Sequence, residues 1–109
     1  MYGDLESMKA YWKEMEVRET SVDAKFSNGP CFLSAAHLVA GSGGAATAII
    51  RDGHDISGEA KVYLAALTSA TDPRFFNPPI YFKKGLYVDV ASNVTSVLVH
   101  FLPARPRPE

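Results

Sequence analysis

The sequence has little of what marks exported, membrane-bound or nucleic-acid-binding proteins. Its 109 residues contain one cysteine, Cys31, so no disulfide can form within the chain. The formal net charge is −1, which provides no strong field to attract nucleic acid or an anionic membrane. No apolar run reaches the length of a membrane span, and residues 1–6 lack the basic and apolar regions of a signal peptide. We therefore expect a protein of a reducing compartment without nucleic-acid or membrane partners.

The composition is that of a folded protein. Hydrophobic residues make up 47% of the chain and charged residues 21%, whereas disordered chains combine low hydrophobicity with high net charge. A chain of this length buries roughly two-thirds of its surface on folding. The sequence therefore predicts one domain with one core.

Near the amino terminus the apolar residues follow a helical period. Leu5, Met8, Trp12 and Met15 are three and four residues apart, which predicts one stripe of an amphipathic helix, with Asp4 as its N-cap. A helix of about three turns is marginal in water by itself. The stripe must therefore pack either on its own domain or on a neighbouring chain.

After the helix the pattern changes to that of strands. Val22, Ala24 and Phe26 alternate with polar residues, which predicts a strand with one face in water. The almost wholly apolar segment Cys31–Ala40 predicts a central strand covered on both faces. Because a glycine-rich turn follows, we expect residues 45–51 to pair with this strand as a hairpin.

The second half predicts further strands, at residues 61–67, 75–82, 86–90 and 96–102. We expect residues 75–82 at a sheet edge because Pro78 and Pro79 cannot donate ladder hydrogen bonds. Six or seven short strands separated by turns predict a mainly β protein, a compact antiparallel β-sandwich or jelly-roll-like domain with a short N-terminal helix. The expected organisation is an N-terminal helix, arm and first strand in residues 1–28, the sandwich in 29–102 and an extended proline-rich tail in 103–109.

No catalytic, cofactor or metal site can be assigned from the pattern. His37, His54 and His100 fall in different segments, without the short spacings of metal ligands. Asp52 and Asp55 flank His54 in one turn, but the spacing of a calcium loop is missing. Neither Cys31 nor a serine has a base in a recognisable nucleophile motif. We therefore expect a protein that is not an enzyme.

The apolar residues outside the predicted core indicate contact surfaces instead. The candidate interface combines the helix stripe with aromatic residues of the edge segment, and its members are Leu5, Met8, Trp12, Met15, Phe75, Phe76 and Tyr81. An alternative is a small ligand- or glycan-binding module that stacks sugars on Phe75, Tyr81 or Tyr87.

Residues 76–90 join the proline pair Pro78 and Pro79 to a lysine-glycine turn and a short strand, and residues 95–99 begin a valine-rich last strand. This arrangement, over roughly residues 30–102, resembles small virion proteins of tailed bacteriophages. The resemblance implies a non-enzymatic structural protein of the head-decoration, head-fibre-base or head-to-tail accessory type. It also implies a location in the virion, after assembly in the host cytoplasm, with copies of itself and other virion proteins, such as the major capsid or portal-region proteins, as partners.

Overall fold

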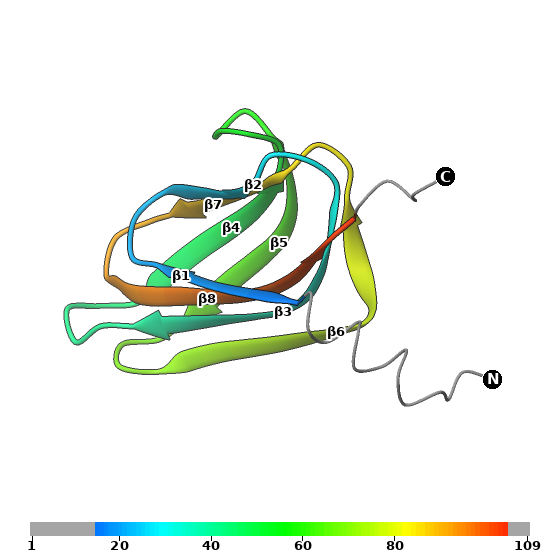
Figure 1. Ribbon diagram of the computed structural model, residues 1–109. Coiled ribbons are helices and arrows are strands. Elements are labelled where there is room, and N and C mark those ends of the chain that lie inside the picture. Colours follow the sequence, from blue (N-terminus) through cyan, green and yellow to red (C-terminus); the bar gives the residue numbers. More distant parts are fainter. Residues whose placement is uncertain (1–14, 105–109) are drawn as a thin grey trace, which may run out of the picture.

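A computed structural model describes residues 15–104, which form two antiparallel four-stranded sheets packed face to face (Figure 1). Sheet I contains, in spatial order, β1 (Glu16–Thr20), β8 (Val94–Pro103), β3 (Cys31–Ala40) and β6 (Thr71–Phe82). Sheet II contains, in spatial order, β2 (Ala24–Ser27), β7 (Leu86–Val90), β4 (Ala46–Asp52) and β5 (Glu59–Ala66). The prediction of a mainly β sandwich is confirmed.

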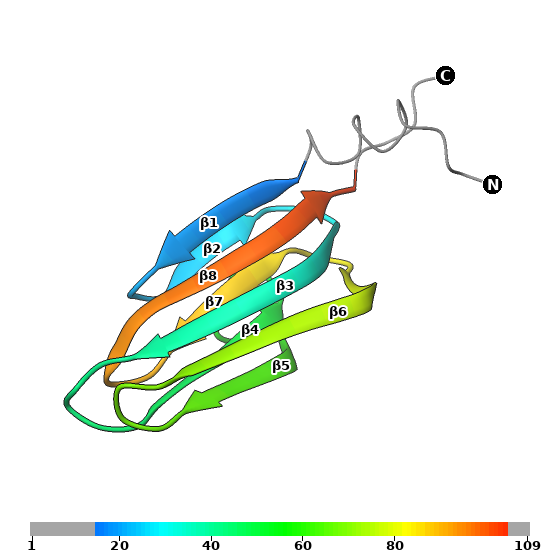
Figure 2. The ribbon, with the colours of Figure 1, turned by 90° about the horizontal axis from the view of Figure 1, so that it is seen from below.

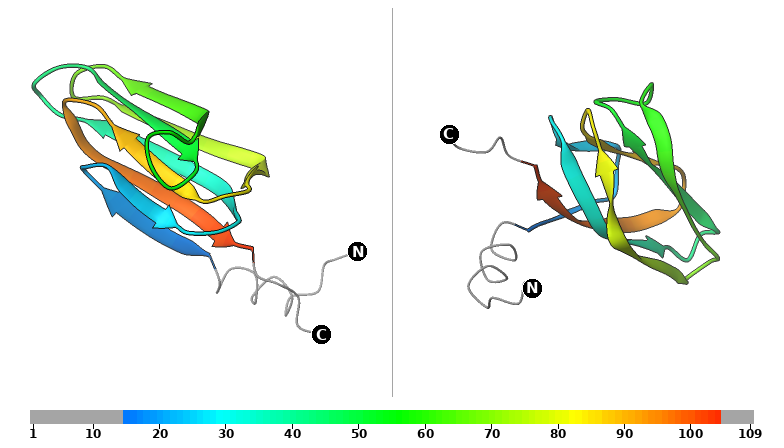
Figure 3. Two further views of the ribbon diagram at one scale, coloured as in Figure 1. Left: turned by 90° about the horizontal axis from the view of Figure 1, so that it is seen from above. Right: turned by 90° about the vertical axis from the view of Figure 1, so that its right-hand side faces the viewer.

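The order of the strands is that of a jelly roll. Every connection except the one from β4 to β5 passes from one sheet to the other, so chain neighbours are seldom ladder neighbours (Figures 1 and 3). Orders of 1-8-3-6 and 2-7-4-5 arise when two Greek keys wrap around one core. Within residues 15–104 there is no helix, and so no helix that could cross a membrane.

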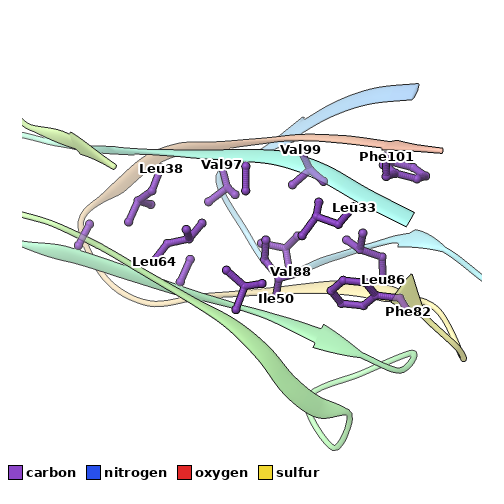
Figure 4. Close-up of a cluster of buried hydrophobic side chains, with 14 of the residues drawn as sticks. Leu33, Leu38, Ile50, Leu64, Phe82, Leu86, Val88, Val97, Val99 and Phe101 are labelled. Atoms are coloured by element: carbon purple, nitrogen blue, oxygen red, sulfur yellow. The ribbon is translucent and has the colours of Figure 1, made fainter. Parts of the chain in front are cut away.

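The core is a single apolar layer between the sheets (Figure 4). Its members alternate along the strands with outward-facing residues, as the two-residue period of a strand requires. Val62, Leu64 and Ala66 of β5 and Val97, Val99 and Phe101 of β8, which alternate along the strands that the sequence predicts, are all buried. The largest fully buried side chains are Phe82, Phe101, Leu33, Leu38, Ile50, Leu64 and Leu86.

The structure has eight strands, so the expected number of six or seven is wrong. The missed strand is β1, whose sequence has only Val17 as an apolar residue and therefore shows no alternation. Its backbone nevertheless pairs with β8 from Glu16 opposite Phe101 to Thr20 opposite Val97. A mostly exposed edge strand can be held by its backbone hydrogen bonds to the next strand, so its sequence does not have to alternate between apolar and polar residues.

The expected hairpin of residues 31–40 and 45–51 is also wrong. β3 pairs with β6 and β8 in sheet I, whereas β4 pairs with β5 and β7 in sheet II. The intervening glycine-rich turn therefore spans the two layers instead of closing a ladder. Gly44 has φ of +156°, and a Cβ there would lie 2.9 Å from Nδ2 of Asn93, so this crossing favours glycine.

Two further expectations are decided by the sheets. β3 is central in sheet I, as predicted, but only one of its faces is fully covered, because Phe32 on the other face is 36% exposed. The proline-containing β6 lies at the sheet edge, also as predicted.

Residues expected on either side of the sandwich domain are part of its strands. Residues 16–27, expected in the N-terminal segment, supply β1 to one sheet and β2 to the other. Pro103, expected to begin the tail, ends β8 opposite Cys31. The predicted helix, apart from Met15, and the tail beyond residue 104 lie outside the described residues.

One buried carboxylate holds the turn between β6 and β7. Asp52, at the end of β4, is 8% exposed, and its Oδ atoms accept hydrogen bonds from the backbone N–H groups of Lys83 (3.0 Å), Lys84 (2.7 Å) and Gly85 (3.4 Å). A Cβ on Gly85 would lie 2.6 Å from the carbonyl oxygen of Ser27, so only glycine fits this turn. Asp52 thereby joins the end of β4 to the segment that carries the chain from sheet I to sheet II.

The Asp52→Ala variant should lose roughly 1–3 kcal/mol of unfolding free energy, because two part-buried N–H donors and one buried donor would lose their acceptor. Urea unfolding followed by circular dichroism measures this loss. Glu59→Ala is the matched control, since Glu59 is an exposed carboxylate in the next strand, and its effect should stay within about 0.5 kcal/mol. Equal effects of the two substitutions would contradict the role given to Asp52.

The same carboxylate should make stability depend on pH. Burial opposes the charge of Asp52, but the N–H donors of Lys84, Lys83 and Gly85 outweigh it and hold the pKa below the ordinary value of 3.8. A carboxyl group whose pKa is depressed by folding stabilises the native state above its unfolded-state pKa. Its contribution should be lost as the pH falls through the folded-state value.

The measurement is the urea midpoint at neutral pH and at successively lower pH values through the acid range. The free energy of unfolding should fall in acid, and it should fall less steeply for Asp52→Asn, which has no charge to lose. Parallel curves for the two proteins would show that Asp52 does not contribute to the pH dependence.

Candidate interaction surface

The outer face of sheet II carries several charged residues, one ion pair between β4 and β7, and the exposed Tyr63 of β5. Arg51 of β4 donates from Nε to Oδ2 of Asp89 on β7 at 3.0 Å, and from Nη1 to the carbonyl oxygen of Gly58 at 3.1 Å. Lys61 and Lys25 are exposed on neighbouring strands of the same sheet. This face is therefore well suited to contact with water.

The outer face of sheet I is apolar by comparison, and Figure 2 shows the four strands that form it. Its exposed members are Val17 (51%), Phe32 (36%), Phe75 (82%) and Tyr81 (46%). Half-buried Val39, Leu98 and Leu102 lie between them on β3 and β8. We call these seven residues the outer apolar face. His37 of β3 and His100 of β8 lie on the same outward side, so polar residues interrupt this face. Exposed apolar residues gathered on one face mark an interaction site more often than scattered single residues do.

Three aromatic residues lie along the pairing of β3 with the edge strand β6, and two of them are in contact. The rings of Phe32 and Tyr81 lie opposite each other in the ladder, with centroids 5.1 Å apart and planes at 42°. Phe75 lies opposite Ala35, beyond an irregularity in the ladder that falls between Leu33 and Ala35. We call Phe32, Phe75 and Tyr81 the aromatic edge.

The structure describes four of the seven predicted interface residues, Met15, Phe75, Phe76 and Tyr81. Leu5, Met8 and Trp12 lie outside the described residues. The alternation of side chains along β6 places Phe75 and Tyr81 on the outer apolar face. Phe76 is half-buried and packs against the core.

Met15, the fourth stripe residue, is half-buried and sits just before β1. Its Sδ accepts a hydrogen bond of 3.5 Å from Oγ of Ser34 on β3.

Sequence reasoning missed Phe32 and Val17 as surface residues. Phe32 stands in an apolar run that was expected to be covered on both sides, although it alternates with buried Cys31 and Leu33. That alternation was the available signal. Val17 belongs to the strand that was not predicted.

The polar side chains at the end of β4 and in the turn after it form hydrogen bonds with the surrounding backbone and with one another. Asp52 accepts the three N–H groups of the β6–β7 turn, and Oδ1 of Asp55 accepts hydrogen bonds from the backbone N–H and the hydroxyl of Ser57. Nε2 of His54 lies 3.0 Å from the carbonyl oxygen of Asn28 and 2.8 Å from that of Lys84. Since carbonyl oxygens only accept, Nε2 carries a proton and donates. The polar side chains of this turn, those of Asp52, His54 and Asp55, are thus hydrogen-bonded within the protein.

The histidines do not come together into a site. His37 is on β3, His100 is on β8 and His54 is in the turn after β4. Among residues 15–104, no group of three or more His, Cys, Asp or Glu is placed to hold a metal ion. Within the same part of the chain, every buried side-chain nitrogen or oxygen has a hydrogen-bond partner. We therefore assign the outer apolar face, and no polar cluster, as the candidate functional site.

Cys31 is a core residue with no exposed surface. Burial is the main cause that raises the pKa of its thiol from 9.0 to about 11, so the thiolate that acts as a nucleophile is scarce at neutral pH. The prediction that Cys31 packs as a small hydrophobic residue is confirmed.

The Cys31 thiol should therefore react with a disulfide reagent such as dithionitrobenzoate orders of magnitude more slowly in the native protein than in urea. The release of thionitrobenzoate measures both rates on the same sample. Comparable rates in the two conditions would show that the native protein exposes this thiol.

No family model matches the chain, and no curated protein matches it. Among solved structures, the chain is similar to RmlC from Streptococcus suis in complex with dTDP-D-xylose, with 11% identity and a TM-score of 0.37. The match covers 95% of this chain and 51% of that one, so this chain spans about half the length of the RmlC chain. An identity and a TM-score this low assign neither a family nor an activity.

Proposed function

We propose that this chain is a non-enzymatic structural component of a phage virion, in a decoration or accessory role. It packs through the aromatic edge against copies of itself or against major capsid or portal-region proteins. The observation that carries the proposal is that one edge strand of sheet I exposes two aromatic residues, Phe75 and Tyr81. The strands of sheet II expose one, Tyr63, on a face that also carries the Arg51–Asp89 ion pair. The virion location is taken from the resemblance of residues 76–90.

The physical argument for a protein partner is the cost of the aromatic edge in water. Phe75 is 82% exposed, and covering an aromatic side chain that water would otherwise contact is favourable by roughly 1.5–3 kcal/mol. Aromatic residues are enriched at the centres of protein interfaces, where a few of them contribute most of the binding energy. Jelly rolls occur in viral capsid proteins and in unrelated families, so the fold supports a structural role without specifying it.

The test is association of the purified full chain, measured by sedimentation over a range of concentrations. The wild type should associate reversibly, and Phe75→Ser should weaken association roughly tenfold or more, as truncation of a central aromatic contact does. Tyr63→Ser is the matched control, because Tyr63 is 64% exposed on β5 of sheet II. Association should be unchanged in this control.

The virion assignment is tested separately in assembled particles. Mass spectrometry of purified particles should find the chain in wild-type virions and much less of the Phe75→Ser variant. A monomeric wild-type chain that is also missing from particles would overturn the proposal. Equal losses with Phe75→Ser and Tyr63→Ser would show that the aromatic edge has no special role.

A ligand-binding module for glycans is the second candidate, because Phe75 and Tyr81 are exposed as stacking on a sugar requires. The third aromatic residue of that hypothesis is elsewhere: Tyr87 is on β7 of sheet II. Burial, followed by the carboxylates of Asp23 and Asp89, raises the pKa of Tyr87. Binding of the wild type to a glycan array, abolished by Tyr81→Ser, would favour this candidate over self-association.

A further inference from the structure

The turn between β2 and β3 contains an asparagine followed by a glycine, Asn28 and Gly29. In such a pair the backbone nitrogen of the glycine can attack Cγ of the asparagine side chain, because glycine has no side chain to obstruct the approach. The backbone nitrogen gives up its proton and bonds to Cγ, and the amide nitrogen leaves with a proton as ammonia. Water then opens the cyclic imide at one carbonyl or the other, which gives aspartate or isoaspartate. The reaction needs water and no oxidant, reductant or cofactor.

The fold leaves this pair open to the reaction. Asn28 is exposed, and the group that lies 3.0 Å from Nε2 of His54 is its backbone carbonyl oxygen, not its side-chain amide. Apart from the chain neighbours, a Cβ on Gly29 would meet no heavy atom within 4 Å, so the glycine has room to rotate toward the amide. The N–H of Gly29 donates a long hydrogen bond of 3.4 Å to Oγ of Ser27. The attacking nitrogen is therefore held only weakly.

A second pair of similar chemistry, Asp52 and Gly53, is held in place by the fold. The Oδ atoms of Asp52 accept hydrogen bonds from the β6–β7 turn, and the N–H of Gly53 donates to the carbonyl oxygen of Gly85 at 3.2 Å. A Cβ on Gly53 would lie 2.8 Å from Cα of Gly58, so this backbone is closely packed. Cyclisation at Asp52 would break all of these contacts, whereas cyclisation at Asn28 would break one long hydrogen bond.

The other two asparagines of the chain lack a suitable attacking group. Asn77 is followed by Pro78, which has no N–H to deprotonate. Asn93 is followed by the β-branched Val94, whose side chain crowds the backbone nitrogen. Nδ2 of Asn93 also donates to the carbonyl oxygen of Ala45 at 3.3 Å. The reaction should therefore be confined to Asn28.

We infer that Asn28 is a modification site, which the folded protein converts to aspartate and isoaspartate by attack of its own Gly29 nitrogen. Isoaspartate lengthens the main chain by one methylene group and turns the carbonyl that His54 contacts into a carboxylate outside the chain path. Nε2 of His54 also lies 2.8 Å from the carbonyl oxygen of Lys84, so the site is joined to the β6–β7 turn. The isoaspartate form should loosen this end of the sandwich, whereas the aspartate form keeps the original chain path.

Incubation of the full chain in mildly alkaline buffer, in which the Gly29 N–H loses its proton more readily, tests the site. Peptide mapping by mass spectrometry should find conversion of amide to acid at Asn28, as aspartate and isoaspartate, and none at Asn77 or Asn93. A synthetic peptide of residues 24–33 gives the unconstrained rate, and the native chain should react within several-fold of it. Digestion in heavy-oxygen water marks any conversion that occurs during the mapping.

Gly29→Ala is the matched variant. It adds only a Cβ, for which the turn has room, so the fold should be retained while conversion of Asn28 slows several-fold. A native chain that stays unconverted while the peptide converts would overturn the site. Equal rates of conversion in Gly29→Ala and the wild type would also overturn it, because the attacking nitrogen would then have no role.

The effect on the fold is measured by comparing the two products. The isoaspartate form, separated by chromatography, should unfold at a lower urea concentration than Asn28→Asp, which carries the same added charge on an unchanged chain path. Equal urea midpoints would contradict the loosening of the His54 contact. Neither measurement involves the aromatic edge, so both outcomes are independent of the proposed function.

Discussion

The buried carboxylate of Asp52 holds the β6–β7 turn, in which the chain passes from sheet I to sheet II for the last time. Its two Oδ atoms accept hydrogen bonds from the backbone N–H groups of Lys83, Lys84 and Gly85. These three residues lie between strands, so their N–H groups take no part in a sheet. With this turn fixed at the end of β4, β7 pairs with β4 while β6 pairs with β3. Phe82 at the end of β6 and Leu86 at the start of β7 flank this turn, and both are fully buried in the apolar layer between the sheets.

Aspartates make similar contacts at other positions around the sandwich. Asp72 of β6 accepts the N–H of Ala65 on β5 at 3.0 Å, and so joins edge strands of different sheets. Oδ1 of Asp23 accepts the N–H of Val90 at 2.7 Å. A jelly roll leaves backbone donors unpaired where its two sheets meet at the sides, and a charged acceptor satisfies them strongly. These contacts leave sheet I free to present an apolar outer face without loosening the fold.

The outer face shows why a surface is harder to predict than a core. Burial of alternate residues in β5 and β8 follows from their sequence, because a strand has two sides and only one faces the other sheet. Whether the second side meets water, a partner or another part of the chain depends on what lies opposite. Phe32 is more than 40 residues from Phe75 and Tyr81 in sequence, and only the pairing of β3 with β6 places it beside their strand.

The sequence by itself determined the mainly β class, most strand positions, the edge position of β6 and the buried state of Cys31. These are local properties, set by side-chain period, proline chemistry and the lack of a second cysteine. Only the tertiary structure decided that β3 and β4 lie in opposite sheets, that β1 is a strand and that Asp52, His54 and Asp55 are occupied by their own turn. These features depend on hydrogen bonds between residues distant in sequence, whose partners no local pattern specifies.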